Sequence, residues 1–293
     1  METGILFAIG TAAAFALSQV LVRRATYGTG ESFSALTVSV LVSLPVLAIL
    51  LTAVGQWDDF LSLRAEHYGL LAGAGLTHLV FARFLYFTST RLIGANPTAA
   101  IARTSVVFSI VFGIVFLGER ITGMQLSGAV IIMVGAILTN TEITRRTFRI
   151  STAGLLMGFG TAVCASISAV LIRPVMQETD AVYAATAVMY FAAGLVISVI
   201  ALVDRRRLSN ITGQPGAALG VFVISGIILV GGHLLRFSAL EHAQVSIVQP
   251  VIATTVLFVL LFSWLGNRRI DVFNWRVLAG VIMVMGGMVL IYL

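Results

Sequence analysis

Lysine is absent from this 293-residue chain, so all eighteen basic residues are arginines, and they face only twelve acidic residues. Charged side chains make up 10% of the sequence, whereas an average soluble domain carries about 25%. A soluble protein of this size could not cover its surface with so few charges. The net charge of +6 is scattered along the chain and forms no Lys/Arg-rich tract, which argues against a nucleic-acid partner.

Cysteine is nearly absent as well. The single Cys164 excludes an internal disulfide, and together with four scattered histidines it forms no recognisable metal-ligand spacing. We therefore expect neither a metal nor another cofactor. Catalytic signatures are missing too: there is no Gly-x-Ser-x-Gly, no His-Glu-x-x-His and no phosphate-binding glycine loop with lysine. The sequence predicts that the protein is not an enzyme and does not use ATP directly.

Hydrophobic residues make up 59% of the chain, and its mean hydropathy is +1.04. Apolar runs of about 20 residues, enough to cross the hydrocarbon layer of a bilayer, recur throughout. Each should be a helix, because lipid offers the backbone no hydrogen-bond partner. The sequence thus predicts an all-α, multi-pass protein of the cell (plasma) membrane, with the lipid bilayer as its first partner. Ten spans are expected, at Gly4–Val22, Ser32–Val54, Tyr68–Thr88, Asn96–Leu117, Gly123–Thr139, Gly154–Ile172, Ala181–Val203, Gly216–Leu240, Val245–Leu265 and Phe273–Tyr292.

The chain repeats itself with an offset of 150 residues. Residues 4–23 and 154–173 align without a gap, and nine of the twenty positions are identical, including glycine, threonine, serine and arginine. We predict two five-helix repeats, 1–140 and 153–293, joined by a polar junction at 141–152. Because five is an odd number, the second repeat must enter the membrane upside down, and inverted repeats are typical of secondary transporters.

A charged corner joins the last two spans of each half. It reads Leu117-Gly118-Glu119-Arg120-Ile121 in the first half and Leu265-Gly266-Asn267-Arg268-Arg269-Ile270 in the second. Glu119 and Arg120 are expected to cap a helix or to pair locally, whereas Asn267 has no adjacent acid. We therefore expect Glu119→Gln to disturb folding or gating more than Asn267→Asp. The effect should be modest, since exposed ion pairs contribute about 0–1 kcal/mol.

With two five-span halves, the Leu-Gly-Glu-Arg corner and Pro250 in the ninth span, the chain resembles the drug/metabolite transporter superfamily, in particular its ten-helix EamA-type branch. Asn267 and Ala100 depart from the pattern, since an acid and a proline would match there. The resemblance implies that spans one to four and six to nine line a central cavity. It also implies that spans five and ten lie at the periphery, as packing or dimer helices.

Two glycine pairs mark those peripheral spans. Gly128 and Gly135 in span five correspond to Gly280 and Gly287 in span ten, and the members of each pair are seven residues apart. Seven residues make about two helical turns, so each pair shares one helix face, and small residues let helices approach closely. The pairs could serve contacts within the chain or a homodimer, and the sequence leaves both open.

Polar groups inside the spans are the main functional signal, because an arginine at a helix centre costs about 2.5–3.5 kcal/mol. Arg83 and Arg103 could bind substrate, or could pair structurally with carbonyls at a broken helix. Arg236 could instead snorkel to a helix end, and the histidines could be satisfied core residues. The candidate substrate-binding residues are Arg83, Arg103, His78, His233, Arg236, Gln249, Ser18 and Ser168.

The predicted function is secondary transport of small organic solutes or metabolites, by alternating access between the inverted repeats. A non-transporting membrane receptor or assembly protein, and a passive channel, are the alternatives. Arg83 and Arg103 should lie at similar depth, and the interior of the spans contains no aspartate or glutamate. Two such cations repel each other in a low dielectric, so the expected substrate is anionic or zwitterionic and carries a carboxylate or phosphate.

Orientation gives the first prediction. The loops after the odd-numbered spans hold twelve arginines and the other loops three, so the positive-inside rule places both termini outside the cell. The resemblance implies the reverse, with both termini inside. From the charge count we expect external protease to remove a C-terminal tag from intact cells. A tag that is protected until the cells are opened would contradict this orientation.

Overall fold

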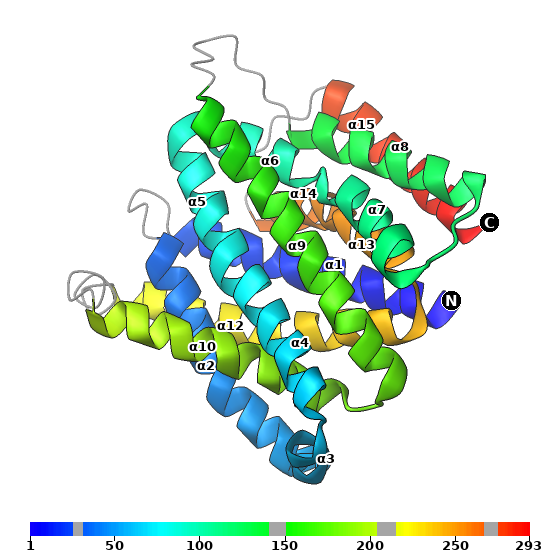
Figure 1. The fold of residues 1–293 in the computed structure, drawn as a ribbon. Helices are drawn as coiled ribbons and strands as arrows, with labels where there is room; N and C mark the ends of the chain where they lie inside the picture. Colours follow the sequence, from blue (N-terminus) through cyan, green and yellow to red (C-terminus); the bar gives the residue numbers. More distant parts are fainter. Residues whose placement is uncertain (26–31, 141–150, 204–214, 267–274) are drawn as a thin grey trace.

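The computed structural model describes all residues except 26–31, 141–150, 204–214 and 267–274 (Figure 1). Every element in the described part is helical. The first half contains α1 (Glu2–Ala25), α2 (Ser32–Val54), α3 (Trp57–Ser62), α4 (Ala65–Gly75), the π-helical turn η1 (Leu76–Phe81), α5 (Ala82–Ile93), α6 (Ala95–Ala102), α7 (Ser105–Leu117) and α8 (Gly123–Asn140). The second half contains α9 (Thr152–Glu178), α10 (Val182–Val203), α12 (Gly216–His242), α13 (Val245–Ala253), α14 (Thr255–Gly266) and α15 (Trp275–Tyr292).

These helices confirm the predicted all-α membrane fold. Within the described residues nine helical stretches are long and apolar enough to cross a bilayer, and the shorter apolar α8 provides the tenth span. The expected spans differ from this in detail. Span three contains a π-turn, spans four and nine are each broken, and the short α3 was not expected. The predicted polar junction lies almost entirely outside the described residues.

The two halves are interlocked through their first and third spans. Helix α1 of the first half packs along α12 of the second, and α9 of the second half packs along α5 of the first. Glycines permit both crossings: a methyl group on Gly10 would lie 3.1 Å from Leu235, and one on Gly160 would lie 3.0 Å from Leu85. Each contact joins residues that correspond under the 150-residue offset. The repeat is therefore a repeat of packing as well as of sequence.

Helices α8 and α15 pack against each other at one edge of the bundle (Figure 1). A methyl group on Gly128 would lie 2.7 Å from the carbonyl oxygen of Gly287, and one on Gly135 would lie 2.7 Å from that of Gly280. The glycine pairs therefore face each other within the chain, which decides between the two alternatives that the sequence left open. A homodimer would have to use other surfaces of these helices.

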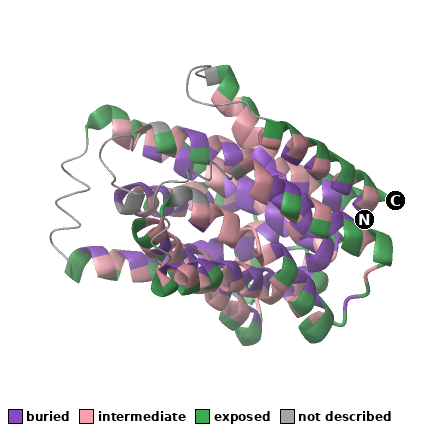
Figure 2. Ribbon diagram, turned by 90° about the horizontal axis from the view of Figure 1, so that it is seen from above, coloured by how far each residue is buried: buried purple, intermediate pink, exposed green. Residues whose placement is uncertain are grey.

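The two ends of the chain meet. The hydroxyl of Tyr292 donates a hydrogen bond of 3.1 Å to Oε1 of Glu2, and both termini lie together in the two views (Figures 1 and 2). An even number of spans places both termini on the same side of the membrane, and the contact between Tyr292 and Glu2 agrees with this arrangement.

The outer faces of the helices remain apolar although they are exposed. Leu6, Val115, Phe116 and Leu195 are each 67–68% exposed, and green outward faces surround a purple interior in Figure 2. A protein surrounded by water rarely exposes so much continuous apolar surface, whereas lipid tails cover it at no cost. The molecule is an integral, multi-pass membrane protein.

Adjacent glycines on α15 provide a test of the glycine contact. A methyl group on Gly287 would lie 2.6 Å from the Gly128 carbonyl oxygen, whereas nothing lies within 4 Å of one on Gly286. We expect Gly287→Ala to destabilise the detergent-purified protein by about 1–3 kcal/mol, the usual range for overpacking. Gly286→Ala is the matched control and should melt at the parent temperature. Equal melting curves for the two variants would contradict the described packing.

Candidate substrate-binding site

Spans four and nine are broken at corresponding threonines. Thr104 separates α6 from α7, with φ −63° and ψ −9°, and Thr254 separates α13 from α14, with φ −65° and ψ −5°. Each hydroxyl donates a 2.7 Å hydrogen bond to the carbonyl oxygen three residues earlier, in Ile101 and in Val251. Such local bonds compete with the helical ladder and bend it. Broken helices of this kind commonly form the substrate sites of secondary transporters.

Proline does not cause both breaks. Pro250 precedes the break in α13, but Ala100 occupies the corresponding position in α6 and the chain breaks there nonetheless. The threonine hydroxyl is the feature that the two breaks share. Arg103 lies directly before the first break, and its buried Nε has no hydrogen-bond partner among the described residues.

One extra residue in span three distinguishes the first half from the second. A methyl group on Gly226 would lie 2.7 Å from the Ser39 carbonyl oxygen, and one on Gly75 would overlap the Met189 carbonyl. Ser39 and Met189 are 150 residues apart, but Gly75 and Gly226 are 151 apart. Further along the span, Leu85 and Leu235 are again 150 residues apart. The first half therefore has one more residue than the second between these two points. The η1 turn lies there and absorbs the additional residue, as π-turns do.

The η1 turn holds His78 against a buried polar cluster. Its ring meets the ring of His233 edge-on, with centroids 5.5 Å apart. His233 Nδ1 lies 2.9 Å from the carbonyl oxygen of Leu229 and 2.9 Å from the hydroxyl of Tyr190. Since a carbonyl only accepts, Nδ1 carries the proton and the neutral ring presents a lone pair on Nε2. Tyr190 and Leu229 thereby fix the orientation of His233.

Arg236 lies on the same face of α12 as His233, and it is buried inside the protein. Only 2% of its surface is exposed, and Nη1 and Nη2 have no hydrogen-bond partner among the described residues. The snorkelling alternative for Arg236 is therefore wrong, because the side chain points into the bundle and not toward a helix end. An unpaired buried guanidinium is costly, so this position demands an explanation.

The three membrane arginines are connected through two tyrosines. Arg83 and Arg236 both act electrostatically on Tyr190. Arg103 and Arg83 both act on Tyr86. Each of the two phenols is therefore within electrostatic reach of two of the three arginines. Sequence reasoning missed both tyrosines, because tyrosine in an apolar span carries no signal of its own.

The remaining candidates differ in their availability. The hydroxyls of Ser18 and Ser225 share a hydrogen bond of 2.7 Å between α1 and α12, so Ser18 is engaged in helix packing. The corresponding Ser168 hydroxyl and Nε2 of Gln249 are buried without a partner among the described residues. Ser168 and Gln249 therefore have hydrogen-bonding capacity to offer, and Ser18 has little.

Glu119 joins the two halves at the end that holds the termini. Its carboxylate accepts hydrogen bonds from the backbone N–H groups of Val245, at 2.6 Å, and Ser246, at 2.9 Å. These are the first residues of α13, where a helix dipole favours a negative charge. Glu119 is therefore a buried cap of a distant helix, which confirms the capping alternative. Among the described residues it forms no ion pair with Arg120.

Arg173 holds the other side of the same corner. Its guanidinium donates to the carbonyl oxygens of Leu240 and Glu241, the latter at 2.9 Å, near the end of α12. A cation at a helix C-terminus is the complement of the carboxylate at the N-terminus of α13. Together Glu119 and Arg173 fix the turn from α12 into α13. Asn267, the counterpart of Glu119, lies outside the described residues.

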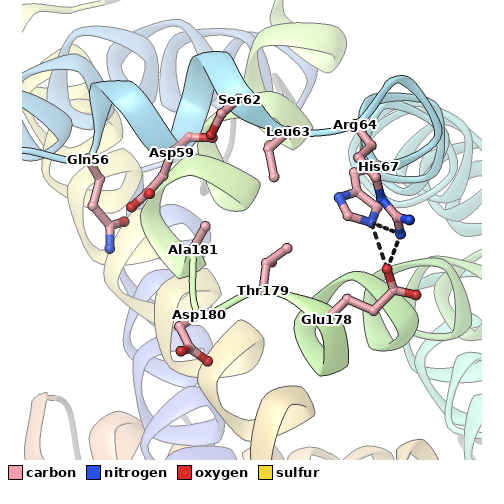
Figure 3. A pocket seen from close by; sticks show the side chains of 10 residues that line it. All are labelled: Gln56, Asp59, Ser62, Leu63, Arg64, His67, Glu178, Thr179, Asp180 and Ala181. Carbon is pink, nitrogen blue, oxygen red and sulfur yellow. Dashed lines mark hydrogen bonds and ion pairs between the residues drawn. The ribbon is translucent and has the colours of Figure 1, made fainter.

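An open pocket of about 730 Å³ lies between α3–α4 and the corner joining α9 to α10 (Figure 3). Arg64 donates to Glu178 and lies 2.8 Å from Glu66, and His67 Nε2 lies 3.1 Å from the Glu178 carboxylate. Donor atoms of Glu66, His67 and Glu178 lie close enough to reach one metal ion. The Arg64 guanidinium already supplies the positive charge there. The pocket is away from the central arginines, so it is not the candidate substrate site.

The profile of the EamA-like transporter family matches residues 2–141 and 152–293, nearly the whole chain in two copies. This chain belongs to the EamA-like transporter family. The match covers both halves separately, as an internal duplication requires. The family is one of membrane transporters, a class of protein in which broken helices and charged side chains inside the spans are expected.

Among known proteins, this EamA-like chain is similar to an uncharacterized transporter in the cobO 3′ region of a Sinorhizobium species. The two are 31% identical over 133 residues, which is 45% of this chain and 92% of the relative. A solved crystal structure covers 98% of this chain and 94% of its own, with a TM-score of 0.79 and 15% identity. At that identity the likeness shows a shared fold only.

The cap on α13 provides a prediction for this EamA-like protein. Glu119→Gln removes the negative charge and turns an amide N–H toward a backbone N–H, so we expect a loss of about 1–3 kcal/mol of stability. Melting of the purified protein measures it. Glu66→Gln, at an exposed carboxylate on the same end, is the control and should change stability little. If Glu119→Gln melts with the control, the cap is not a stabilising contact.

Proposed function

We propose that this family member is a secondary transporter of small organic solutes that carry a carboxylate or phosphate, working by alternating access between its inverted halves. The observation that carries the proposal is a set of three arginines within the spans, of which Arg236 is buried and Arg83 and Arg103 are half-buried. Arg83, Arg103 and Arg236 have no salt bridge with any residue in the described part of the chain. Three such charges repel one another in a low dielectric.

An anionic substrate offsets this repulsion better than water does. A guanidinium meets a carboxylate or phosphate with two parallel hydrogen bonds. On this view the empty site is electrostatically strained, and a bound substrate relieves the strain. Occupancy is thereby coupled to the change between inward-open and outward-open states, because a ligand shifts a conformational equilibrium by its difference in affinity for the two states.

The interlocked halves support alternating access. Each half contributes its first span to the other half's third span, through the matched contacts of Gly10 with Leu235 and of Gly160 with Leu85. Two similar units in opposite orientations can exchange conformations, so that one gate closes as the other opens. The breaks at Thr104 and Thr254 are equivalent points at which spans four and nine can bend.

Flux measurements distinguish the transporter from its alternatives. In proteoliposomes a carrier saturates and shows counterflow, a channel passes solute without saturation, and a receptor or assembly protein moves nothing. The proposal fails if only neutral or cationic solutes are transported.

Charge removal at the two central arginines tests the anion site. Arg83→Gln and Arg103→Gln keep hydrogen-bonding capacity but lose the charge, so the KM for a transported carboxylate should rise about tenfold or more in each variant. Arg91→Gln is the control, because Arg91 is exposed near the end of the same helix as Arg83. Folded variants with an unchanged KM for carboxylates would exclude the anion site.

A further inference from the structure

Arg236 is the largest fully buried side chain in the described part of the chain, and its two terminal nitrogens are unpaired. The acid on the same helix, Glu241, lies five residues later and 3.7 Å from His242, and it forms no salt bridge with Arg236 among the described residues. His233, one turn before Arg236, contacts Tyr190 from α10 and His78 from η1. A guanidinium carries five N–H donors and no acceptor, so what it lacks here is an acceptor, and a charged one by preference.

His78 supplies a second unpaired group at the same place. Its Nδ1 is buried without a partner among the described residues, and its ring is held edge-on against His233. The ring can present N–H to a ligand, whereas the His233 proton is committed to Leu229. His233 and Tyr190 therefore position the site, and Arg236 and His78 are the groups free to donate to a ligand.

The local backbone favours a binding role for this place over a packing role. His78 lies in the six-residue π-turn η1, which absorbs the one extra residue that makes the third span of the first half differ from that of the second. A π-turn has poorer hydrogen bonding than an α-helix, and such turns occur mostly at functional sites. The turn holds the imidazole of His78 against His233, which lies one helical turn before Arg236.

We propose that Arg236 and His78 form a second oxyanion subsite beside the one at Arg83 and Arg103, so that the transported solute carries two anionic groups. The inference rests on the proposed function and refines its substrate class to dianions, such as dicarboxylates. One carboxylate binds between Arg83 and Arg103 near Tyr86, and the other binds Arg236 and His78 near Tyr190. Tyr190, whose hydroxyl lies 2.9 Å from His233 Nδ1, borders the second subsite.

The site accounts for the third arginine, which one monoanion cannot do. A single carboxylate that engages Arg83 and Arg103 leaves Arg236 without a counter-charge. A dianion of suitable length pairs with the arginines of both subsites, and its two negative charges offset two of the three positive charges there. The site then selects dianions over monoanions, because a bound monoanion leaves the buried guanidinium of Arg236 unpaired, and this costs binding free energy.

Matched acids of equal length test the proposal. We would measure thermal stabilisation of the detergent-purified protein, and counterflow in proteoliposomes, with succinate against butyrate and with glutarate against pentanoate. The parent should bind at least one dicarboxylate about tenfold more tightly than its monocarboxylate partner. Arg236→Gln should abolish that preference. His78→Gln should reduce the preference in the same direction.

Controls separate this inference from the proposed function. Arg91→Gln should keep the dicarboxylate preference, and Arg83→Gln should weaken binding of both acids. Arg236→Lys keeps the charge and provides a folded alternative if Arg236→Gln does not purify as a monodisperse protein; it should retain part of the preference. Equal affinity of the parent for both acids of each pair, or a preference that survives Arg236→Gln, overturns the second subsite but leaves the anion site standing. Failure of every carboxylate and every organic phosphate to bind or move overturns both.

Discussion

Everything in this molecule depends on two close helix crossings, α1 on α12 and α9 on α5. Lipid tails are as apolar as leucine, so helices in a bilayer gain little by hiding side chains from their surroundings, and close backbone contact must hold them together. Gly10 and Gly160 provide that approach, each against a leucine of the opposite half. Because the first span of each half packs against the third span of the other half, neither half forms a complete bundle by itself. The third spans, which carry Arg83, His233 and Arg236, are thereby fixed between the halves.

The spans and their inverted duplication were predictable because bilayer thickness sets the length of each apolar run, and the repeat preserves polar residues. The details inside the spans were not. Thr104 and Thr254 break their helices through one local hydrogen bond each, and threonines elsewhere in apolar spans leave the helix intact. The π-turn adds a single apolar residue, which hydropathy does not register. The partner of Glu119 lies 126 residues away, and no local pattern points to it.

The candidate site was found in part, for an energetic reason. Arginine in a span is expensive, so Arg83, Arg103 and Arg236 stand out in the sequence. The direction of a side chain is not encoded in the same way, which is why Arg236 could be taken for a snorkelling residue near the end of its helix. Tyr86 and Tyr190 were missed because an aromatic ring in a membrane span is ordinary. Only the folded structure shows that both tyrosines lie within electrostatic reach of the arginines.

The extra residue at η1 has a thermodynamic consequence. If the halves were identical, the inward-open and outward-open states would be images of each other, with equal free energies and equal populations. A turn that exists in one half only removes that degeneracy, since converting one state into the other now exchanges unlike third spans. Under the proposed alternating access, the empty protein would populate its two states unequally, and a difference of about 1.4 kcal/mol already gives a tenfold bias. One inserted residue in one half of a duplicated fold would then set which state the empty transporter prefers.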